Sequence, residues 1–379
     1  MADRPRVAIV YDWLTSLGGA ERVLDAVVEL LPGAPIYTLL YRKEVFRGSL
    51  VAERAVHTSS LDRLPLARTH YRAFLPLMPW AIERFDLRDY DLILSLSHAV
   101  AHGVLHRPDQ LHISYTSTPA RYAWSQPETA LRERVGRGRA FAASWALHYF
   151  RLWDLSAAQR VDRFVAISHW VRRNVWRYYR RRAQVVYPPV DLALYRPLAP
   201  RGETYVTVSR LVPYKRVGLI TEAFARLRLP LVVIGDGPEH RRLAERAPPN
   251  VRFLGWQPDE AVAELLGRAK AFVYAAEEDF GIAPVEAQAS GCPVIAFGSG
   301  GVLETVIPEK TGMLYPEQTV ESLIAAVERF DKGEVSFDVA ELRRNAERFR
   351  RESFLGEFRA LLEREWLRFS ERNGSGADT

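Results

Sequence analysis

Short apolar runs alternate with helix-like stretches along the whole chain, and this alternation restricts the fold more than any other feature. The runs read as buried strands and amphipathic segments separate them, which is typical of parallel strands joined by crossover helices. The sequence therefore predicts an α/β fold. The predicted strands are 6–11, 35–40, 92–95, 111–115 and 163–167 in the first half, and 205–208, 231–234, 251–254, 271–274 and 293–296 in the second.

A proline-rich segment lies between these two sets of strands. Residues 187–191 and 196–202 contain too many prolines for a helix or a central strand. A chain of 379 residues is also too long for one comfortable core. We therefore predict two domains, residues 1–190 and residues 191–379.

The end of the second range contains an amphipathic helix over about residues 354–369. The tail after it, residues 373–379, is polar and glycine-containing, so we expect it to be disordered. The apolar positions of the predicted helix are Phe354, Leu355, Phe358, Leu361, Leu362 and Leu367.

The composition indicates an ordinary globular protein. No run of about 18 apolar residues is present, so no transmembrane helix is expected. The first residues lead directly into a strand pattern without the apolar segment of a secretory signal. The single cysteine, Cys292, excludes an intramolecular disulfide and fits a reducing compartment. A cytoplasmic location is predicted.

Arginines are concentrated in two stretches of a chain whose formal net charge is +6. Basic surfaces with interleaved aromatic residues contact nucleic acid or anionic membranes, although an arginine-rich face can also simply be solvated. No signature of a nucleic-acid-binding module accompanies these arginines, so we expect no nucleic-acid partner and favour a peripheral association with an anionic membrane. The stretches hold Arg132, Arg134, Arg137 and Arg139, and then Arg172, Arg173, Arg177, Arg180, Arg181 and Arg182.

Two carboxylates, Glu278 and Glu286, flank a Phe-Gly turn eight positions apart. The first follows the predicted strand 271–274, and the second lies about two turns into the helix that begins near Pro284. Ligands of open α/β sheets bind at the carboxyl ends of the strands, and a helix start attracts anions. This run therefore predicts a site for a ligand that is part phosphate and part polyhydroxyl.

Two other loops carry candidate phosphate-binding groups. Arg210 and Lys215 follow strand 205–208, where two fixed cations can neutralise a diphosphate. Gly18 and Gly19 open a helix after the first strand, where glycine lets the backbone approach a ligand closely, although a plain tight turn explains them equally well.

Residues 277–286 are similar to the E-x7-E element of the retaining GT4 family of nucleotide-sugar glycosyltransferases. Similarity continues through 208–216, 235–238 and 300–312, and covers nearly the whole chain. This resemblance implies the GT-B fold. That fold has two Rossmann-like domains whose parallel sheets face each other across a cleft, with a C-terminal helix that crosses back to the first domain.

The resemblance also assigns donor roles residue by residue. It implies that Glu278 binds the hydroxyls of the donor sugar and Glu286 those of the ribose, while Arg210 and Lys215 bind the diphosphate. The remaining donor residues are a phosphate cradle at Phe280, Gly281 and Ile282, a base-pocket position at Trp256, and the glycine loop at Gly18 and Gly19, which would face the donor phosphates.

The acceptor side carries one departure from the family. The resemblance places Tyr11, Asp12 and Arg121 near the acceptor. In segment 115–124, many relatives have a histidine beside the reacting sugar where this chain has Ser117. A serine can donate a hydrogen bond but is no general base at neutral pH. His98 and His102, one strand earlier, are candidate substitutes, although a lone histidine is more often structural.

The run Asp89-Tyr90-Asp91 imitates a metal-binding D-x-D motif, but it precedes a predicted strand instead of following one. We therefore expect no essential metal and no cofactor. The resemblance implies a retaining hexosyltransferase that uses GDP-mannose and a glycan or lipid-linked acceptor in the synthesis of cell-surface polysaccharide or glycolipid. The alternatives are a GT-B phosphorylase, a nucleotide-sugar epimerase, and a binding protein that has lost catalysis. The acceptor, the linkage, the choice of GDP over UDP and the oligomeric state stay open.

Overall fold

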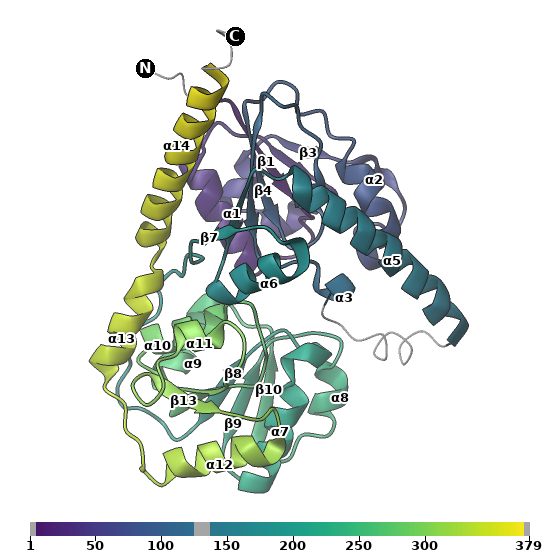
Figure 1. Cartoon of the computed structure of the whole chain (residues 1–379). Helices are drawn as coiled ribbons and strands as arrows, with labels where there is room; N and C mark the ends of the chain where they lie inside the picture. The colour runs from purple at the N-terminus through teal and green to yellow at the C-terminus, as the bar shows by residue number, and fades with distance from the viewer. Residues whose placement is uncertain (1–4, 125–136, 375–379) are drawn as a thin grey trace. The chain divides into compact units, whose positions relative to one another are not determined.

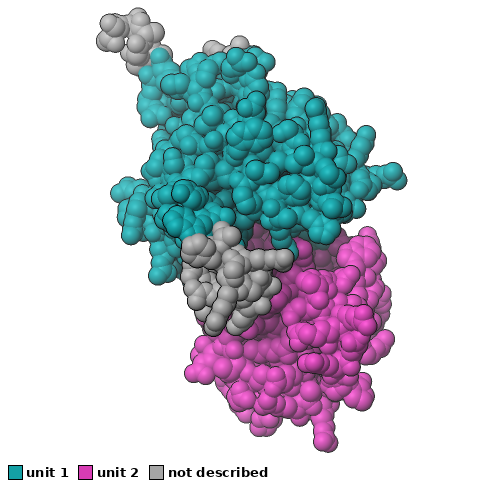
Figure 2. All heavy atoms as spheres, turned by 90° about the vertical axis from the view of Figure 1, so that its right-hand side faces the viewer, with its two compact units in different colours: residues 1–187, 354–379 teal, residues 188–353 magenta. Residues whose placement is uncertain are grey.

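The computed structural model describes residues 5–124 and 137–374, so Arg132, Arg134 and the tail residues 375–379 lie outside the described residues. The chain divides into two compact units, which Figure 2 colours separately. Unit 1 comprises residues 1–187 together with 354–379, and unit 2 comprises residues 188–353. The chain thus leaves unit 1 in the first of the two proline-rich runs and returns to it for its last helix.

Unit 1 is built on a seven-stranded parallel sheet with the order β3-β2-β1-β4-β5-β6-β7. The order runs outward in both directions from the neighbouring strands β1 and β4, so the topological switch point lies between their carboxyl ends. The strands are β1 (Val7–Tyr11), β2 (Ile36–Thr38), β3 (Val56–Thr58), β4 (Leu92–Ser97), β5 (Leu111–Thr116), β6 (Arg163–Ala166) and β7 (Ala183–Val185).

Helices and short 3₁₀ turns connect these strands (Figure 1). The helices of this part of the chain are α1 (Gly19–Leu30), α2 (Met78–Ile82), α3 (Arg121–Trp124), α5 (Arg137–Arg160), α6 (His169–Tyr179) and α14 (Arg351–Gly374). The 3₁₀ turns are η1 (Lys43–Phe46), η2 (Leu50–Glu53), η3 (Ser60–Arg63), η4 (Tyr71–Leu77) and η5 (Ala101–Gly103).

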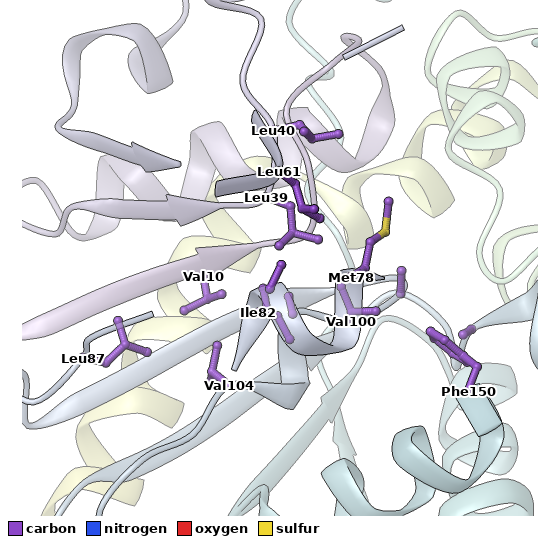
Figure 3. Packing of buried hydrophobic residues seen from close by; sticks show 14 of the residues in the cluster. Val10, Leu39, Leu40, Leu61, Met78, Ile82, Leu87, Val100, Val104 and Phe150 are labelled. Carbon is purple, nitrogen blue, oxygen red and sulfur yellow. The ribbon is translucent and has the colours of Figure 1, made fainter. Parts of the chain in front are cut away.

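One hydrophobic cluster of unit 1 lies between the sheet and α2 (Figure 3). Val10 of β1 and Leu39, which follows β2, pack with Met78 and Ile82 of α2, and none of the four side chains is exposed. These apolar side chains remove a face of the sheet from water, which is why the strands read as continuous apolar runs in the sequence.

Unit 2 contains a six-stranded parallel sheet with the order β10-β9-β8-β11-β12-β13, and its switch point lies between β8 and β11. The strands are β8 (Tyr205–Val208), β9 (Leu231–Ile234), β10 (Val251–Gly255), β11 (Ala271–Tyr274), β12 (Val294–Phe297) and β13 (Gly312–Tyr315). The helices are α7 (Val217–Leu227), α8 (His240–Ala244), α9 (Asp259–Arg268), α10 (Ile282–Ala289), α11 (Val302–Thr305), α12 (Val320–Asp331) and α13 (Val339–Ala346), with 3₁₀ turns η6 (Pro213–Lys215) and η7 (Glu347–Phe349).

All ten predicted strands are present, and the prediction of two parallel α/β sheets is confirmed. The sequence analysis missed β3, β7 and β13, which are edge strands of their sheets. Strands β3 and β7 have only three residues each and are partly exposed, so they lack the continuous apolar run that marks a central strand.

From Phe354 onward, helix α14 belongs to unit 1, as the fold prediction required. The rings of Phe354 and Phe358 lie 5.9 and 5.2 Å from the ring of Tyr115 on β5. Nε of Arg163 donates a hydrogen bond of 2.7 Å to the carboxylate of the buried Glu365. Leu367, which was predicted to lie on the apolar face, is 51% exposed, because the buried stripe of α14 passes through Glu365 and Phe369 and leaves Leu367 outside it.

Candidate active site

The predicted donor residues of unit 2 lie on the loop between β11 and α10. Strand β11 ends at Tyr274, and α10 begins at Ile282. Gly281 precedes the helix with a φ of +90°, a left-handed conformation that favours glycine. Phe280 is buried, and its ring lies 5.3 Å from that of Phe349. The backbone before α10 is therefore anchored by an aromatic contact and turned by a glycine.

Gly300 and Gly301, which follow β12, hold this loop closely. A Cβ added at Gly300 would lie 2.3 Å from the carbonyl oxygen of Glu278, and one added at Gly301 would lie 2.4 Å from Cα of Phe280. The N–H of Gly301 donates a hydrogen bond of 2.6 Å to the carbonyl of Glu278. The two glycines therefore set the position of the Glu278 backbone.

The Glu278 carboxylate is held by two side chains. Lys215 Nζ forms an ion pair with Oε1, and the hydroxyl of Tyr274 donates to Oε2. The Lys215 and Glu278 side chains are 14% and 18% exposed. Nζ of Lys215 also lies 5.6 Å and 5.9 Å from the ring centres of Tyr214 and Tyr274. Each carboxylate oxygen keeps a second lone pair, so Glu278 can still accept a hydrogen bond from a hydroxyl group.

The other predicted donor residues differ in exposure. Arg210, two residues beyond β8, is exposed, and the described residues include no hydrogen-bond or ion-pair partner for its side chain. Glu286, on α10, is only 6% exposed. Because β8 and β11 are neighbours at the switch point, the loops carrying Arg210 and Glu278 leave the same edge of the sheet.

Trp256 follows β10, and its side chain is 73% exposed. Gly255 before it has a φ of +68°, so the chain turns sharply out of the strand. An exposed indole at this place can stack on a planar ring. The structure thus puts Trp256 on a loop at the carboxyl edge of the second sheet, and nothing within the described part of unit 2 covers most of it.

In unit 1, Asp12 and His98 meet at the switch point between β1 and β4. Asp12 is fully buried, and its carboxylate accepts backbone N–H groups of four successive residues, from His98 to Ala101, at 2.5–3.1 Å. Nδ1 of His98 lies 2.9 Å from the same carboxylate. Asp12 could touch an acceptor, as the sequence analysis predicted, only after breaking these bonds, so its geometry suits the positioning of His98.

Of the Asp12–His98 pair, only the His98 side chain is partly exposed. Its side chain is 25% exposed, and its ring packs edge-on against Trp13 at 4.6 Å. Burial opposes the charged imidazolium, but the carboxylates of Asp12 and Glu21 outweigh it and raise the pKa of His98 above its ordinary value. Although burial would raise the pKa of Asp12, His98 and the backbone N–H groups lower it. Each member of the pair therefore stabilises the charged form of the other.

Tyr11 and the glycine loop complete this edge of the first sheet. The buried hydroxyl of Tyr11 donates a hydrogen bond of 3.0 Å to Glu21, in the first turn of α1. Burial raises the pKa of Tyr11, and so does the adjacent carboxylate. Gly18 and Gly19 lie at the start of α1, where a Cβ on Gly18 would lie 3.2 Å from Glu21 Oε2. Glu21, which the sequence analysis did not single out, thus connects the glycine loop to Tyr11.

Ser117 lies directly after β5 and is partly exposed. The backbone N–H of Ser117 donates a hydrogen bond of 2.8 Å to the carbonyl of Ser97, the residue before His98. Ser117 and His98 therefore follow the adjacent strands β5 and β4 at neighbouring positions. The partly buried Arg121 begins α3 shortly afterwards.

A buried carboxylate fixes α3, the helix that carries Arg121. Asp154 of α5 accepts hydrogen bonds from Nε1 of Trp124 at 2.6 Å and from the hydroxyl of Tyr179 at 2.8 Å. His102 Nε2 lies 3.2 Å from the other oxygen of the same carboxylate. His102 is 3% exposed, so the structure favours a structural role for it and leaves His98 as the histidine at the site.

Within residues 5–124 and 137–374 no group of three or more acidic, histidine or cysteine side chains is placed to hold a metal ion. Asp91 of the D-x-D imitation instead accepts the backbone N–H and the side chain of Arg6 at the entry to β4. The described helices include none with the length and apolar character needed to cross a membrane.

Comparison with known proteins agrees with this geometry. Residues 197–352 match the family described as "Glycosyl transferases group 1". The chain is 28% identical to a GDP-mannose-dependent alpha-mannosyltransferase of Mycolicibacterium smegmatis, over 96% of this chain and 99% of that one. It is 29% identical to the protein of that name from Mycobacterium tuberculosis, over 82% and 84% of the two chains.

Solved structures share the fold. The HepE protein of Anabaena, in complex with UDP-glucose, superposes with a TM-score of 0.69 at 18% identity, covering 94% of this chain and 99% of that one. Sucrose-phosphate synthase from Thermosynechococcus elongatus superposes with a TM-score of 0.70 at 18% identity, covering 96% and 100%.

Two parallel sheets, each with side chains gathered at its switch point, and a last helix that returns to unit 1 define a GT-B protein. Residues 197–352 match the group 1 glycosyltransferase family, and the two mannosyltransferases described above align with most of the chain.

Proposed function

We propose that the chain transfers mannose from GDP-mannose, with retention of configuration, to a glycan or lipid-linked acceptor in the synthesis of cell-surface polysaccharide or glycolipid. The observation that carries the proposal is the arrangement of Lys215, Glu278 and Tyr274 beside the start of α10, at the switch point of the second sheet. Two relatives that match most of this chain's length are described as GDP-mannose-dependent, and their name supports the choice of donor.

Each donor group has a role in this proposal. Arg210, Lys215 and the free N–H groups at the start of α10 neutralise the negative charge that develops on the departing diphosphate. Glu278 accepts hydrogen bonds from the sugar hydroxyls, while Glu286 serves the ribose and Trp256 the base. No resident cofactor or metal is required, because the nucleotide sugar is itself a substrate.

Retention is proposed from the similarity of residues 277–286 to a retaining family, and the bonding of Glu278 bears only on the route of transfer. Both of its oxygens are engaged, by Lys215 and by Tyr274, so the carboxylate orients the sugar and is not free to attack the anomeric carbon. Transfer then proceeds on the same face of the sugar through an ion-pair-like step, in which the diphosphate departs as the acceptor oxygen arrives.

The acceptor is assigned to the carboxyl edge of the first sheet. When it is protonated, His98 can donate a hydrogen bond or face an anionic group. Ser117 adds a neutral donor at the neighbouring strand end, and Arg121 a further cation. This combination suits an acceptor that carries both hydroxyl and phosphate groups, such as a lipid-linked glycan, which the chain would meet by associating peripherally with a membrane.

The test is to incubate the purified chain with separate nucleotide sugars and a mixture of glycan and lipid-linked acceptors. Release of GDP from GDP-mannose and an α-linked product, identified by NMR, are expected. A Glu278→Gln variant is the control, because it should bind nucleotide yet lose most of the transfer. Transfer only from UDP-sugars would overturn the choice of donor, and an inverted product would overturn retention.

The same assay separates the alternatives. Turnover that requires inorganic phosphate would indicate a phosphorylase, and interconversion of the free nucleotide sugars would indicate an epimerase. Nucleotide binding without any turnover would indicate a binding protein that has lost catalysis, the alternative for which Ser117 is the only hint in the sequence.

A further inference from the structure

Unit 1 has an arginine-lined cavity at the opposite edge of its sheet from His98. The cavity measures about 550 Å³ and is lined by residues at the beginning of β6 and β7, by residues at the end of α6 and by residues of α14. Five arginines and two carboxylates line it, so its charge is strongly positive. The residues used below are Arg163, Trp176, Arg180, Arg182, Ala183 and Arg368.

The positive charge is only partly compensated. Glu365 pairs with Arg163 at 2.7 Å and with Arg368 at 3.2 Å. Arg181 is committed to backbone carbonyls of Ala158, Gln159 and Val161. Among the described residues, neither Arg180 nor Arg182 has a side-chain partner, and both are exposed. Two guanidinium groups are therefore available at the mouth of the cavity.

The outer face of α6 continues this surface. Arg172, Arg173 and Arg177 are exposed on it, and Trp176, which also lines the cavity, is 51% exposed. An exposed indole next to arginines is typical of the boundary between water and lipid head groups. A soluble anion would need the cavity alone, whereas a bilayer would also use the indole and the exposed arginines of α6 beside it.

We propose that this cavity binds the phosphate of an anionic lipid head group, with Arg180 and Arg182 as its principal ligands. Arginine suits phosphate because its planar guanidinium donates two parallel hydrogen bonds. Trp176 then rests at the level of the head groups, and the exposed arginines of α6 contact neighbouring lipids. The site is independent of the proposed donor and would hold the enzyme at the surface where a lipid-linked acceptor is found.

The first test compares two arginines in the same backbone conformation. Arg180 and Arg228 both follow the last residue of a helix with left-handed φ, +57° and +59°, and Arg228 is exposed in unit 2. Replacing either by glycine removes one charge and relieves the backbone, so neither change should lower the melting temperature. We expect Arg180→Gly to weaken co-sedimentation with phosphatidylglycerol vesicles about fivefold, and Arg180→Gly with Arg182→Gln about twenty-five-fold. Arg228→Gly should have no effect.

The second test distinguishes the contribution of the cavity's shape to vesicle binding from the contribution of its charge. Ala183→Leu on the edge strand β7 narrows the cavity without changing any charge, and circular dichroism checks that the variant folds. It should lose vesicle binding at least fivefold. The proposal would be overturned if Ala183→Leu kept full vesicle binding, or if Arg180→Gly and Arg228→Gly weakened it equally. Either result would show that vesicle binding depends on the overall positive charge and not on the cavity.

The lipid source is tested with phosphatidylcholine vesicles and with soluble glycerol 3-phosphate. The proposal predicts binding to vesicles that contain phosphatidylglycerol, no binding to pure phosphatidylcholine, and weak competition by glycerol 3-phosphate. If calorimetry showed binding of glycerol 3-phosphate but the protein did not bind anionic vesicles, the cavity would be a site for a soluble phosphate ester. The proposal of a lipid ligand would then be wrong.

Discussion

Neutralising Glu278 while keeping its shape should separate catalysis from folding. In Glu278→Gln the amide retains the side-chain volume and can still bond Tyr274, but it loses the ion pair with Lys215. A hydrogen bond to a charged group contributes about 1.5–3 kcal/mol. If the sugar hydroxyls bind this carboxylate in the transition state, kcat/KM should fall about ten- to a hundredfold. The assay is initial-rate release of the nucleoside diphosphate across a range of donor concentrations.

Stability must be measured with activity, because the pair is mostly covered. At 14% and 18% exposure, Lys215 left without its carboxylate should destabilise unit 2 by about 1–2 kcal/mol, between the values for exposed and buried pairs. For a unit of this size that corresponds to about 2–8 °C in melting temperature. The double variant Lys215→Met with Glu278→Gln removes both charges and should recover most of that loss.

The double variant should recover stability without recovering transfer, since Lys215 and Glu278 are both proposed to act on the donor. This divergence is the critical result. If activity returned together with the melting temperature, the pair would be a structural ion pair. The assignment of Glu278 to the sugar would then be wrong.

Three further outcomes are expected. Gly301→Ala should abolish most transfer and lower the melting temperature, because the added Cβ would lie 2.5 Å from the carbonyl oxygen of Asp279. The control is Gly356→Ala, whose added Cβ would have no atom within 4 Å. This control should raise the free energy of unfolding by about 0.5–1 kcal/mol, as measured by thermal unfolding. Because the pKa of His98 is raised, its charged form stabilises the fold at pH values below the ordinary histidine pKa, and this stabilisation is lost as the pH rises through the folded pKa. His98→Asn should therefore remove the loss of activity and of stability at alkaline pH. An unchanged pH profile would contradict this reasoning. Ser117→Ala should reduce the rate about fivefold at most, the value of one neutral hydrogen bond, and a loss of a hundredfold or more would show that Ser117 does more than donate.

The central strands were predictable because each is buried on both faces and therefore leaves a continuous apolar run in the sequence. The edge strands β3 and β7 were not, because half-exposed three-residue strands carry no such signal. The position of Glu278 at a strand end could also be predicted, since it follows from the run 271–274 and the helix start. Its partner Tyr274 is the last residue of that same run, where sequence alone reads it as a core aromatic.

The Asp12–His98 pair shows what spacing cannot reveal. The two residues are 86 positions apart and meet only because β1 and β4 are neighbours in the sheet, a consequence of the strand order. The sequence analysis named both residues and placed Asp12 near the acceptor by resemblance. In the structure the carboxylate of Asp12 is fully buried and accepts hydrogen bonds from the backbone around His98. A buried carboxylate at a strand end could have been suspected only with the strand order known.

The position of α14 also affects how the chain emerges from the ribosome. Unit 2 is continuous in sequence, but unit 1 is split around it and receives its last helix after unit 2 has been made. Until then Tyr115 has no aromatic partner from α14, and Arg163 on β6 lacks its ion-pair partner Glu365. Unit 2 can thus fold during translation while unit 1 waits, incomplete and with apolar surface exposed, for the final residues. Synthesis that stops shortly before residue 354 would leave a finished unit 2 attached to an unfinished and aggregation-prone unit 1.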